Sequence, residues 1–373
     1  MCDCLNTVWL SPLFIHTHTH SLSLYLSLSL SLSLYISLSL SLSLSLLPPS
    51  LSLPPPPTNK FKAKYHKVYA SAEEEAARER AFETSVRLVR RHNHAFEQGL
   101  TSYRMAINAF ADVLPAAPSA GHDSSSSSSS SGPAPLRLRS PDNTGLAIGQ
   151  HVNKSVDWRT HGDVSPVRNQ GQCGAPWAFA AVEAVESMNA IATGTLTILS
   201  LQQVIDCSSP YGTQGCNGGT TGDAFAYIVA NGGLDSAADY PTTGTAEPCD
   251  KEKEKHIVAK VAGYKHVPPN NETLLEAAVF QRPVAAAIDA SSSSFLMYSG
   301  GVYDGPCGTQ LDHAVVVVGY TPEYWIVKNS WGSSWGENGY IFMKRGVSAP
   351  HGICGIAMAA SYPTPPSPAP QRL

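Results

Sequence analysis

The sequence predicts an α+β fold for residues 153–363, in which a helical half is followed by a β-rich half. Apolar residues recur every three or four positions between residues 176 and 232, as they do on one face of a helix. From residue 284 onward, runs of β-branched and aromatic residues dominate instead. A chain of 373 residues with 43% hydrophobic residues has material for one substantial globular domain plus appendages.

Four helices are expected, and their ends are marked by a proline at a first position, a capping box, and glycine or proline after the last turn. The first begins at Pro176, with Phe179, Val182 and Val185 facing inward, and the second begins at the capping box 200–203 and runs toward Cys207. The third follows Gly219 through Ala224, Phe225, Ile228 and Val229 to Gly232, and the fourth spans residues 272–281 before Pro283. The expected strands are 284–288, 314–320, 324–328 and 340–344.

Residues 1–58 do not have the composition of a folded unit. They contain Thr-His repeats, a Ser-Leu alternation over residues 21–46 and a proline-rich end, with no acidic or basic residue between Asp3 and Lys60. The positive region and compact apolar core of a signal peptide are not recognisable. We interpret this stretch as a misannotated start or a degenerate signal region.

Residues 59–118 are charged and have helical periodicity. Glu74, Arg78 and Phe82 lie four residues apart, which places them on one helix face, and Ser85, Val89 and Asn93 continue the pattern. A second motif follows, Ala106-x-Asn108-x-Phe110-x-Asp112. Residues 119–152 form a serine-rich linker that cannot build a core, and residues 364–373 form a tail.

Charge and cysteine content limit the classes of function. The net charge of −4 predicts neither a nucleic-acid partner nor strong electrostatic attachment to a membrane. Six cysteines fall within residues 153–363, and their spacing alone allows fifteen pairings. No CxxC pair is present, so we expect disulfides in an oxidising compartment rather than a metal site, and no cofactor.

Residues 168–180 read Arg-Asn-Gln-Gly-Gln-Cys-Gly-Ala-Pro-Trp-Ala-Phe-Ala and resemble the active-site segment of the papain family of cysteine peptidases, Gln-Gly-x-Cys-Gly-Ser-Cys-Trp-Ala-Phe. The two upstream motifs resemble the helical inhibitory propeptide of the same family. The resemblance covers roughly residues 65–363 apart from the serine linker, and it is closest to plant members. It implies a monomer with a helical lobe and a β-barrel-like lobe, whose intervening cleft binds a peptide or protein, or the chain's own propeptide.

One departure from the family pattern determines the expected chemistry: Pro176 stands where the family has its nucleophilic cysteine. Proline has no nucleophile, and it lacks the backbone N–H that serves the family as one oxyanion donor. Losing a nucleophile costs on the order of a million-fold in rate, and losing one oxyanion donor costs roughly a hundred- to a thousand-fold. Proline is nevertheless well tolerated at a first helical position, so we expect an intact, inactive scaffold.

Three alternatives to this interpretation exist. Cys173 could be the nucleophile, but it matches a disulfide cysteine of the family. Pro176 could be a sequence or gene-model error, in which case the chain is an active cysteine-type endopeptidase. The chain could also be a non-functional gene product.

The remaining catalytic positions of the family are present. Gln170 resembles the side-chain donor of the oxyanion hole, and His313 resembles the general base. Asn329 resembles the residue that orients this histidine, and Trp331 resembles the indole that shields their hydrogen bond. Without a thiolate partner, His313 should behave as a neutral imidazole.

The resemblance also implies a substrate-binding wall. The loop 215–219 resembles the one that hydrogen-bonds an extended peptide backbone, although plain turn geometry explains its glycines equally well. The residues assigned to substrate binding are Gly174, Gly218, Gly219, Thr220, Thr221, Ala287, Leu311, Asp312 and Trp331. The two threonines stand where the family often has bulky apolar residues, which predicts a roomier and more polar pocket.

Family resemblance selects three disulfides, Cys173–Cys216, Cys207–Cys249 and Cys307–Cys354. The family normally carries a seventh, unpaired cysteine, so an even count agrees with a missing nucleophile. A vacuolar, lysosomal or extracellular location follows, in which the sequons at Asn153 and Asn271 could be glycosylated. Removal of the propeptide before residue 155 would require another protease.

Overall fold

The computed structural model describes residues 58–113 and 155–366. All of them belong to one structural unit, Pro56–Leu373. The low-complexity segment up to residue 57, the serine-rich linker, the sequon at Asn153 and most of the tail lie outside the described residues. Within the described part, no helix is long and apolar enough to cross a membrane.

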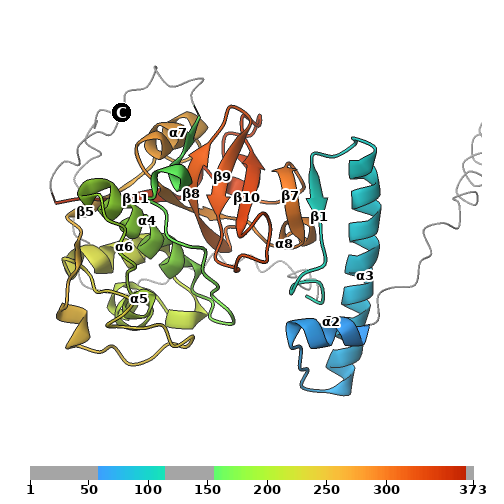
Figure 1. Cartoon of the computed structure of the whole chain (residues 1–373), viewed down its shortest axis with the longest axis horizontal. Coiled ribbons are helices and arrows are strands. Elements are labelled where there is room, and N and C mark those ends of the chain that lie inside the picture. Colours follow the sequence, from blue (N-terminus) through green and yellow to red (C-terminus); the bar gives the residue numbers. More distant parts are fainter. Residues whose placement is uncertain (1–57, 114–154, 367–373) are drawn as a thin grey trace, which may run out of the picture. The chain divides into compact units, whose positions relative to one another are not determined.

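The predicted propeptide consists of α2 (Thr58–Tyr65), the long helix α3 (Ala72–Glu97) and the short strand β1 (Tyr103–Met105) (Figure 1). Phe82, Val86 and Val89 lie three and four residues apart on α3 and are buried on one face. Asn93 binds β1 at one point with both ends of its amide: Oδ1 accepts from the Met105 N–H at 2.9 Å and Nδ2 donates to the Met105 carbonyl at 2.8 Å.

The helical lobe is built around α4, which is buried on nearly all sides. The elements of this lobe are η2 (Trp158–His161), α4 (Pro176–Thr193), α5 (Leu201–Cys207), η3 (Ser209–Tyr211), η4 (Gly215–Asn217), α6 (Thr221–Ala230), β3 (Gly233–Leu234), η5 (Lys253–Lys255) and β4 (Ala259–Lys260). Helix α7 (Glu272–Gln281) has the predicted bounds and is capped by the Asn271 side chain, which accepts from the Leu274 N–H. The predicted helix starts are therefore confirmed, within two residues.

The predicted capping box at the start of α5 is only half right. Ser200 Oγ accepts a hydrogen bond from the Gln203 N–H at 3.0 Å, as expected. The Gln203 side chain does not return to Ser200, because its Oε1 accepts from the Asp235 N–H and the Ser200 N–H is bound to the Asp235 carbonyl. The amide is thus used to tie α5 to the segment that follows β3.

The β-lobe is one large sheet in the order β1-β7-β10-β9-β8-β6-β11-β5, with β2 paired to β8. Its strands are β2 (Val156–Asp157), β5 (Gly263–His266), β6 (Val284–Ile288), β7 (Tyr298–Tyr303), β8 (His313–Tyr320), β9 (Tyr324–Lys328), β10 (Tyr340–Lys344) and β11 (Ala360–Thr364), with the short helices α8 (Ser293–Leu296) and η6 (Ile353–Gly355) between them (Figure 1). The four strands predicted from the sequence are present. Strands β5, β7 and β11 and the two-residue strand β2 were missed.

The missed strand β7 explains why sequence patterns underestimated the sheet. Its two glycines interrupt the β-branched run that signals a strand. Gly301 adopts φ +84°, and a Cβ there would lie 2.4 Å from the Ser102 carbonyl oxygen. The glycine is therefore needed for the antiparallel approach of β1, whose residue Tyr103 pairs with Gly301.

Strand β8 separates two apolar clusters. Val316 and Val318 face the cluster around α4, whereas Val315 and Val317 face a second cluster that also contains Phe82 of the propeptide. Burial on both faces accounts for the unbroken apolar run of this strand. His313 is the first residue of this buried strand, so the pairing of β8 in the sheet fixes the position of its backbone.

Candidate active site

The loop that precedes α4 lies along the end of β9. Gln170 N–H donates to the Ser330 carbonyl at 2.8 Å, Gly332 N–H donates to the Arg168 carbonyl at 3.0 Å, and Asn169 forms an isolated bridge with Trp331. These bonds bring the helical lobe and the β-lobe together at the beginning of α4. Gln170, Asn329 and Trp331, which are far apart in the sequence, thus belong to one site.

Pro176 is the first residue of α4 and is partly buried. Ala175 occupies the N-cap without a side-chain hydrogen bond, and its carbonyl accepts from the N–H groups of Ala178 and Phe179. A proline at this position loses nothing structurally, because the first N–H of a helix has no intrahelical partner. Chemically, it presents only ring carbons at the positive end of the helix dipole.

The described residues contain no free thiol. All six of their cysteines are paired, in the disulfides Cys173–Cys216, Cys207–Cys249 and Cys307–Cys354. These are the three pairs that were expected. Cys173 is therefore not available as an alternative nucleophile in the oxidised chain.

His313 and Asn329 form a hydrogen-bonded pair, with 2.8 Å between Nε2 and Oδ1. The Ser330 N–H also donates to this Oδ1, at 2.7 Å, which identifies the oxygen end of the amide. Since Oδ1 can only accept, Nε2 carries the proton and Nδ1 holds a lone pair. The Trp331 ring lies against the imidazole with 4.7 Å between the ring centroids and 31° between the ring planes.

Burial lowers the pKa of His313 to about 4, and the bond to Asn329 offsets this only in part. The unfolded chain takes up this proton near pH 6.5 and the folded chain only near pH 4. Above pH 6.5 the neutral His313 costs the folded chain nothing. As the pH falls from 6.5 toward 4, the unfolded chain gains a proton that the folded chain does not, and the free energy of unfolding decreases by about 3 kcal/mol in total.

A histidine titration followed by NMR tests this shift. We expect His313 to titrate near pH 4, and His256 to titrate above 6.5, because the Asp239 carboxylate raises the pKa of His256. The two histidines thus shift in opposite directions within one sample. A His313 midpoint near 6.5 would contradict the burial argument.

The Gln170 side chain is held in place by both lobes. Its Oε1 accepts from Ser330 Oγ at 2.7 Å, and its Nε2 donates to the Cys173 carbonyl at 3.1 Å. Nε2 carries a second hydrogen, so the amide can still act as a donor. Sequence reasoning missed Ser330, whose only signal is its position directly after Asn329.

The glycines expected in the substrate-binding wall have clear packing roles. A Cβ on Gly174 would lie 2.5 Å from the Cys216 carbonyl oxygen, and one on Gly219 would lie 2.8 Å from the Trp177 ring. Gly218 adopts φ +129° and turns the chain between η4 and α6. Packing and turn geometry therefore account for these glycines without a bound peptide.

The predicted pocket residues lie on neighbouring elements, but both threonine hydroxyls are already engaged. Thr220 Oγ caps α6 by accepting from the Asp223 N–H, and it donates to the Asp223 carboxylate at 2.7 Å. Thr221 is buried, with its Oγ 3.5 Å from Ser361 Oγ on β11. Ala287 is partly exposed on β6, opposite Ala314 on β8. Leu311 and Asp312, also on the predicted list, directly precede β8, and Asp312 is exposed.

The second propeptide motif reaches the same aromatic cluster. The Phe110 ring lies 4.6 Å from that of Trp331, measured between centroids. Asn108 Nδ2 donates to the Leu296 carbonyl at 2.8 Å, and Asp112 points back into the propeptide, where Lys67 Nζ lies 2.8 Å away. The propeptide thus contacts the indole that covers His313.

Two buried ion pairs hold α4, one to the β-lobe and one to the loop before the helix, and sequence reasoning missed both. Lys328 Nζ lies 3.0 Å from Glu183 Oε2, and both side chains are about 97% or more buried. Arg168 pairs with Glu186, which also accepts from the Leu199 N–H. The available signal was two glutamates in an otherwise apolar helix. The first pair lies next to Asn329 in the chain and fixes its distance from α4.

A helical lobe packed on a β-lobe, preceded by a helical propeptide, defines the papain-like fold in its proform. Residues 152–364 match the model described as papain family cysteine protease, and residues 59–116 match the cathepsin propeptide inhibitor domain (I29). The chain belongs to the papain family of cysteine proteases.

Similar plant proteins and solved proforms agree with this assignment. The chain is 42% identical over 298 residues to the probable cysteine protease RD21B of Arabidopsis thaliana, covering 78% of this chain and 62% of that protein. It is 39% identical over 312 residues to the senescence-specific cysteine protease SAG39 of Oryza sativa subsp. indica, covering 81% of this chain and 88% of that protein.

Among solved structures, the recombinant stem bromelain precursor has a TM-score of 0.68 and 38% identity, over 83% of this chain and 98% of that chain. The proform of the ragweed pollen allergen Amb a 11 has a TM-score of 0.68 and 34% identity, over 83% of this chain and 94% of that chain. The chain spans 62% of the length of several curated relatives, RD21B and the rice oryzain beta chain among them.

Proposed function

We propose that the chain is a papain-family pseudopeptidase, which binds an extended peptide or protein segment in its cleft and does not hydrolyse it. The observation that carries this proposal is Pro176 at the first position of α4. In the family resemblance this is the position of the nucleophile, and proline supplies neither a sulfur nor a backbone N–H. The pairing of all six cysteines in the described residues supports the proposal, because no other thiol there can take over.

The other family positions are assigned the roles that the resemblance implies. Gln170 is the oxyanion-hole donor, His313 the general base and Asn329 the residue that orients it. Their retention fits descent from an active endopeptidase. With no thiol to deprotonate, the neutral His313 has no proton to accept during a reaction, and the three residues act only as part of the cleft.

Peptide binding is assigned to the cleft wall. An extended peptide would pair with backbone groups at Gly218 and Gly219, in the manner of an added strand. Gly174 and Trp331 would flank it, and Thr220, Thr221, Ala287, Leu311 and Asp312 would line the pocket for one side chain. The short threonine side chains would leave this pocket roomy, and because their hydroxyls are engaged within the protein, it would be less polar than the sequence alone implies.

Processing and location form part of the same proposal. We assign residues 59–118 to the inhibitory propeptide and residues 153–363 to the peptidase-like domain, which acts as a monomer. Because the chain cannot cut itself, removal of the propeptide needs another protease acting on the serine-rich linker. Three disulfides support an oxidising compartment, for which we propose the vacuole, the lysosome or the extracellular space.

Loss of activity is tested on the purified chain after its linker has been cut by an unrelated protease. We expect no hydrolysis of fluorogenic peptides and no labelling by a thiol-reactive epoxide. Labelling of the folded protein, together with hydrolysis that the same reagent blocks, would instead identify an active endopeptidase whose residue 176 is misread in this sequence. Absence of folded chain from the tissue that transcribes the gene would indicate a non-functional product.

Peptide binding is tested separately by titrating an extended peptide into cut and uncut chain. The cut chain should bind it and the uncut chain should not, because Phe110 of the propeptide covers Trp331 in the uncut form. If the cut and folded chain did not bind the peptide, the proposal that the cleft binds peptides would be wrong.

A further inference from the structure

Asp235, Asp239 and His256 form a cluster on the helical lobe that includes none of the active-site residues. Each offers one ligand atom, and these atoms lie within 4.8 Å of one another. Asp235 directly follows β3, Asp239 comes four residues later, and His256 ends η5. The fold assembles this cluster from separate segments, so no sequence motif predicts it. The expectation of no metal site was based on motif spacing alone.

Asp235 is the unusual member, because its side chain is only 1% exposed. Its Oδ1 accepts from the Ser236 N–H at 2.6 Å, but its Oδ2 is buried without a hydrogen-bond partner among the described residues. Burial raises the pKa of this carboxyl, and the neighbouring Asp239 carboxyl raises it further. A buried carboxylate oxygen that faces a second carboxylate is costly unless a proton or a cation lies between them.

His256 supplies the nitrogen ligand. Its Nδ1 lies 2.7 Å from Asp239 Oδ2, and both side chains are about half exposed. A surface histidine beside a carboxylate is common: His94 and Glu97 on α3 form such a pair at 3.9 Å, and they belong to no group of three within the described residues. What distinguishes His256 is the buried third ligand behind it.

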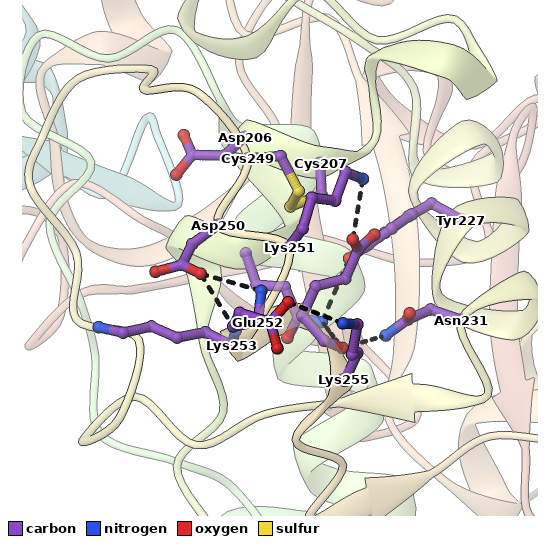
Figure 2. A network of polar contacts seen from close by, with 12 residues as sticks. Asp206, Cys207, Tyr227, Asn231, Cys249, Asp250, Lys251, Glu252, Lys253 and Lys255 are labelled. Atoms are coloured by element: carbon purple, nitrogen blue, oxygen red, sulfur yellow. Dashed lines mark hydrogen bonds and ion pairs between the residues drawn. A yellow bond between two sulfur atoms is a disulfide. The ribbon is translucent and has the colours of Figure 1, made fainter.

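The segments that carry the ligands are held in place before any cation binds. Figure 2 shows the polar network that includes η5: the Asp250 carboxylate accepts from the N–H groups of Glu252 and Lys253 at 3.1 and 3.2 Å, next to the Cys207–Cys249 disulfide. Just beyond His256, the Val258 N–H donates to the Leu234 carbonyl at 2.9 Å, which joins this segment to the residue before Asp235. The backbone therefore presents both sides of the cluster at a fixed separation.

We propose that Asp235, Asp239 and His256 bind one zinc ion. One imidazole and two carboxylates are a donor set that zinc accepts, with water completing a tetrahedron. A tetrahedral zinc ion with ligands at about 2.0–2.2 Å needs about 3.3–3.6 Å between ligand atoms. The 2.7 Å contact must therefore open, and the other separations, which are within 4.8 Å, adjust through the two exposed side chains. The ion satisfies Asp235 Oδ2 and links the end of β3 to the end of η5.

The nearby group of Cys207, Cys249 and Glu254 does not compete for the ion. Its two sulfurs are joined in a disulfide and are not thiolates. The zinc site is independent of Pro176, so it holds whether or not the chain hydrolyses peptides.

Zinc titration of the full chain by calorimetry tests the proposal, at about pH 8, which favours the deprotonated imidazole that binds zinc. The background chain carries His16→Gln, His18→Gln and His20→Gln, because that histidine-rich tract could bind zinc itself. We expect one equivalent to bind, and His256→Gln or Asp239→Asn to weaken it at least about tenfold. The matched control His94→Gln should bind as the background chain does. No zinc binding by the background chain, or unchanged binding by His256→Gln, would overturn the proposal.

Asp235→Asn separates a bound cation from a shared proton. The new amide can donate to Asp239, so the zinc-free variant should melt at a higher temperature than the background chain. Zinc should raise the melting temperature of the background chain and leave that of the variant unchanged. An equal rise in both would show that zinc binds elsewhere.

Discussion

Pro176→Cys should give the chain, which we propose to be inactive, the ability to hydrolyse peptides once its propeptide is removed. The substitution restores a thiol and a backbone N–H at the first position of α4, where the helix dipole favours a thiolate. The lone pair of His313 Nδ1 is available to take the proton, because Nε2 already donates to Asn329. Removing such a nucleophile costs on the order of a million-fold in subtilisin, so we expect a gain of about 10⁴- to 10⁶-fold over the parent in kcat/KM.

Two matched variants show which atoms are responsible. Pro176→Ala restores the N–H without the sulfur and should stay inert. Pro176→Cys combined with His313→Ala should lose most of the gain, because the thiol then has no base. The pKa of His313 should also rise well above its parental value of about 4 in Pro176→Cys, since an imidazolium paired with a thiolate is stabilised. A folded, processed Pro176→Cys chain without activity would mean that other residues of the site are also impaired.

The fold was largely predictable because its elements have strong local signals. Strand β6 at 284–288 and helix α7 at 272–281 were placed with their observed bounds, since apolar periodicity and the flanking Asn271 and Pro283 act within a few residues. Strand β7 was not predictable in this way. Its Gly301 is selected by the close approach of Ser102, about two hundred residues earlier in the chain, and this contact exists only after folding.

The residues of the candidate site likewise fall into those that sequence motifs predicted and those that only the structure revealed. Gln170, His313 and Asn329 stand in long motifs that could be matched to a family, and His313 and Asn329 are hydrogen-bonded in the structure. Ser330, which holds Gln170, and the cluster of Asp235, Asp239 and His256 have no motif, because their partners come from distant segments. A family motif identifies a residue even where its partners are distant in the chain, whereas a residue outside any motif is found only from its tertiary contacts.

Lys328→Met should destabilise the chain by about 3–5 kcal/mol at neutral pH, because it leaves the Glu183 carboxylate buried without its main partner. The control is Lys344→Met, whose partner Asp304 lies 3.3 Å away on the surface, and which should cost less than about 1 kcal/mol. Urea unfolding with the disulfides intact measures both. Adding Glu183→Gln to Lys328→Met should recover part of the loss, since the buried charge is removed as well.

The pH dependence of this loss identifies its cause. Burial raises the pKa of Glu183 above its ordinary value, and the charges of Lys328 and Arg168 oppose that rise. Without Lys328 the folded chain holds the proton on Glu183 to a higher pH, while the unfolded chain releases it near pH 4.5. A group whose pKa is raised by folding loses stability as the pH rises, so the Lys328→Met defect should be small below pH 4.5 and grow toward neutrality. If Lys328→Met lowered the free energy of unfolding equally below pH 4.5 and at neutral pH, Lys328 would act through the packing of its side chain rather than through its charge.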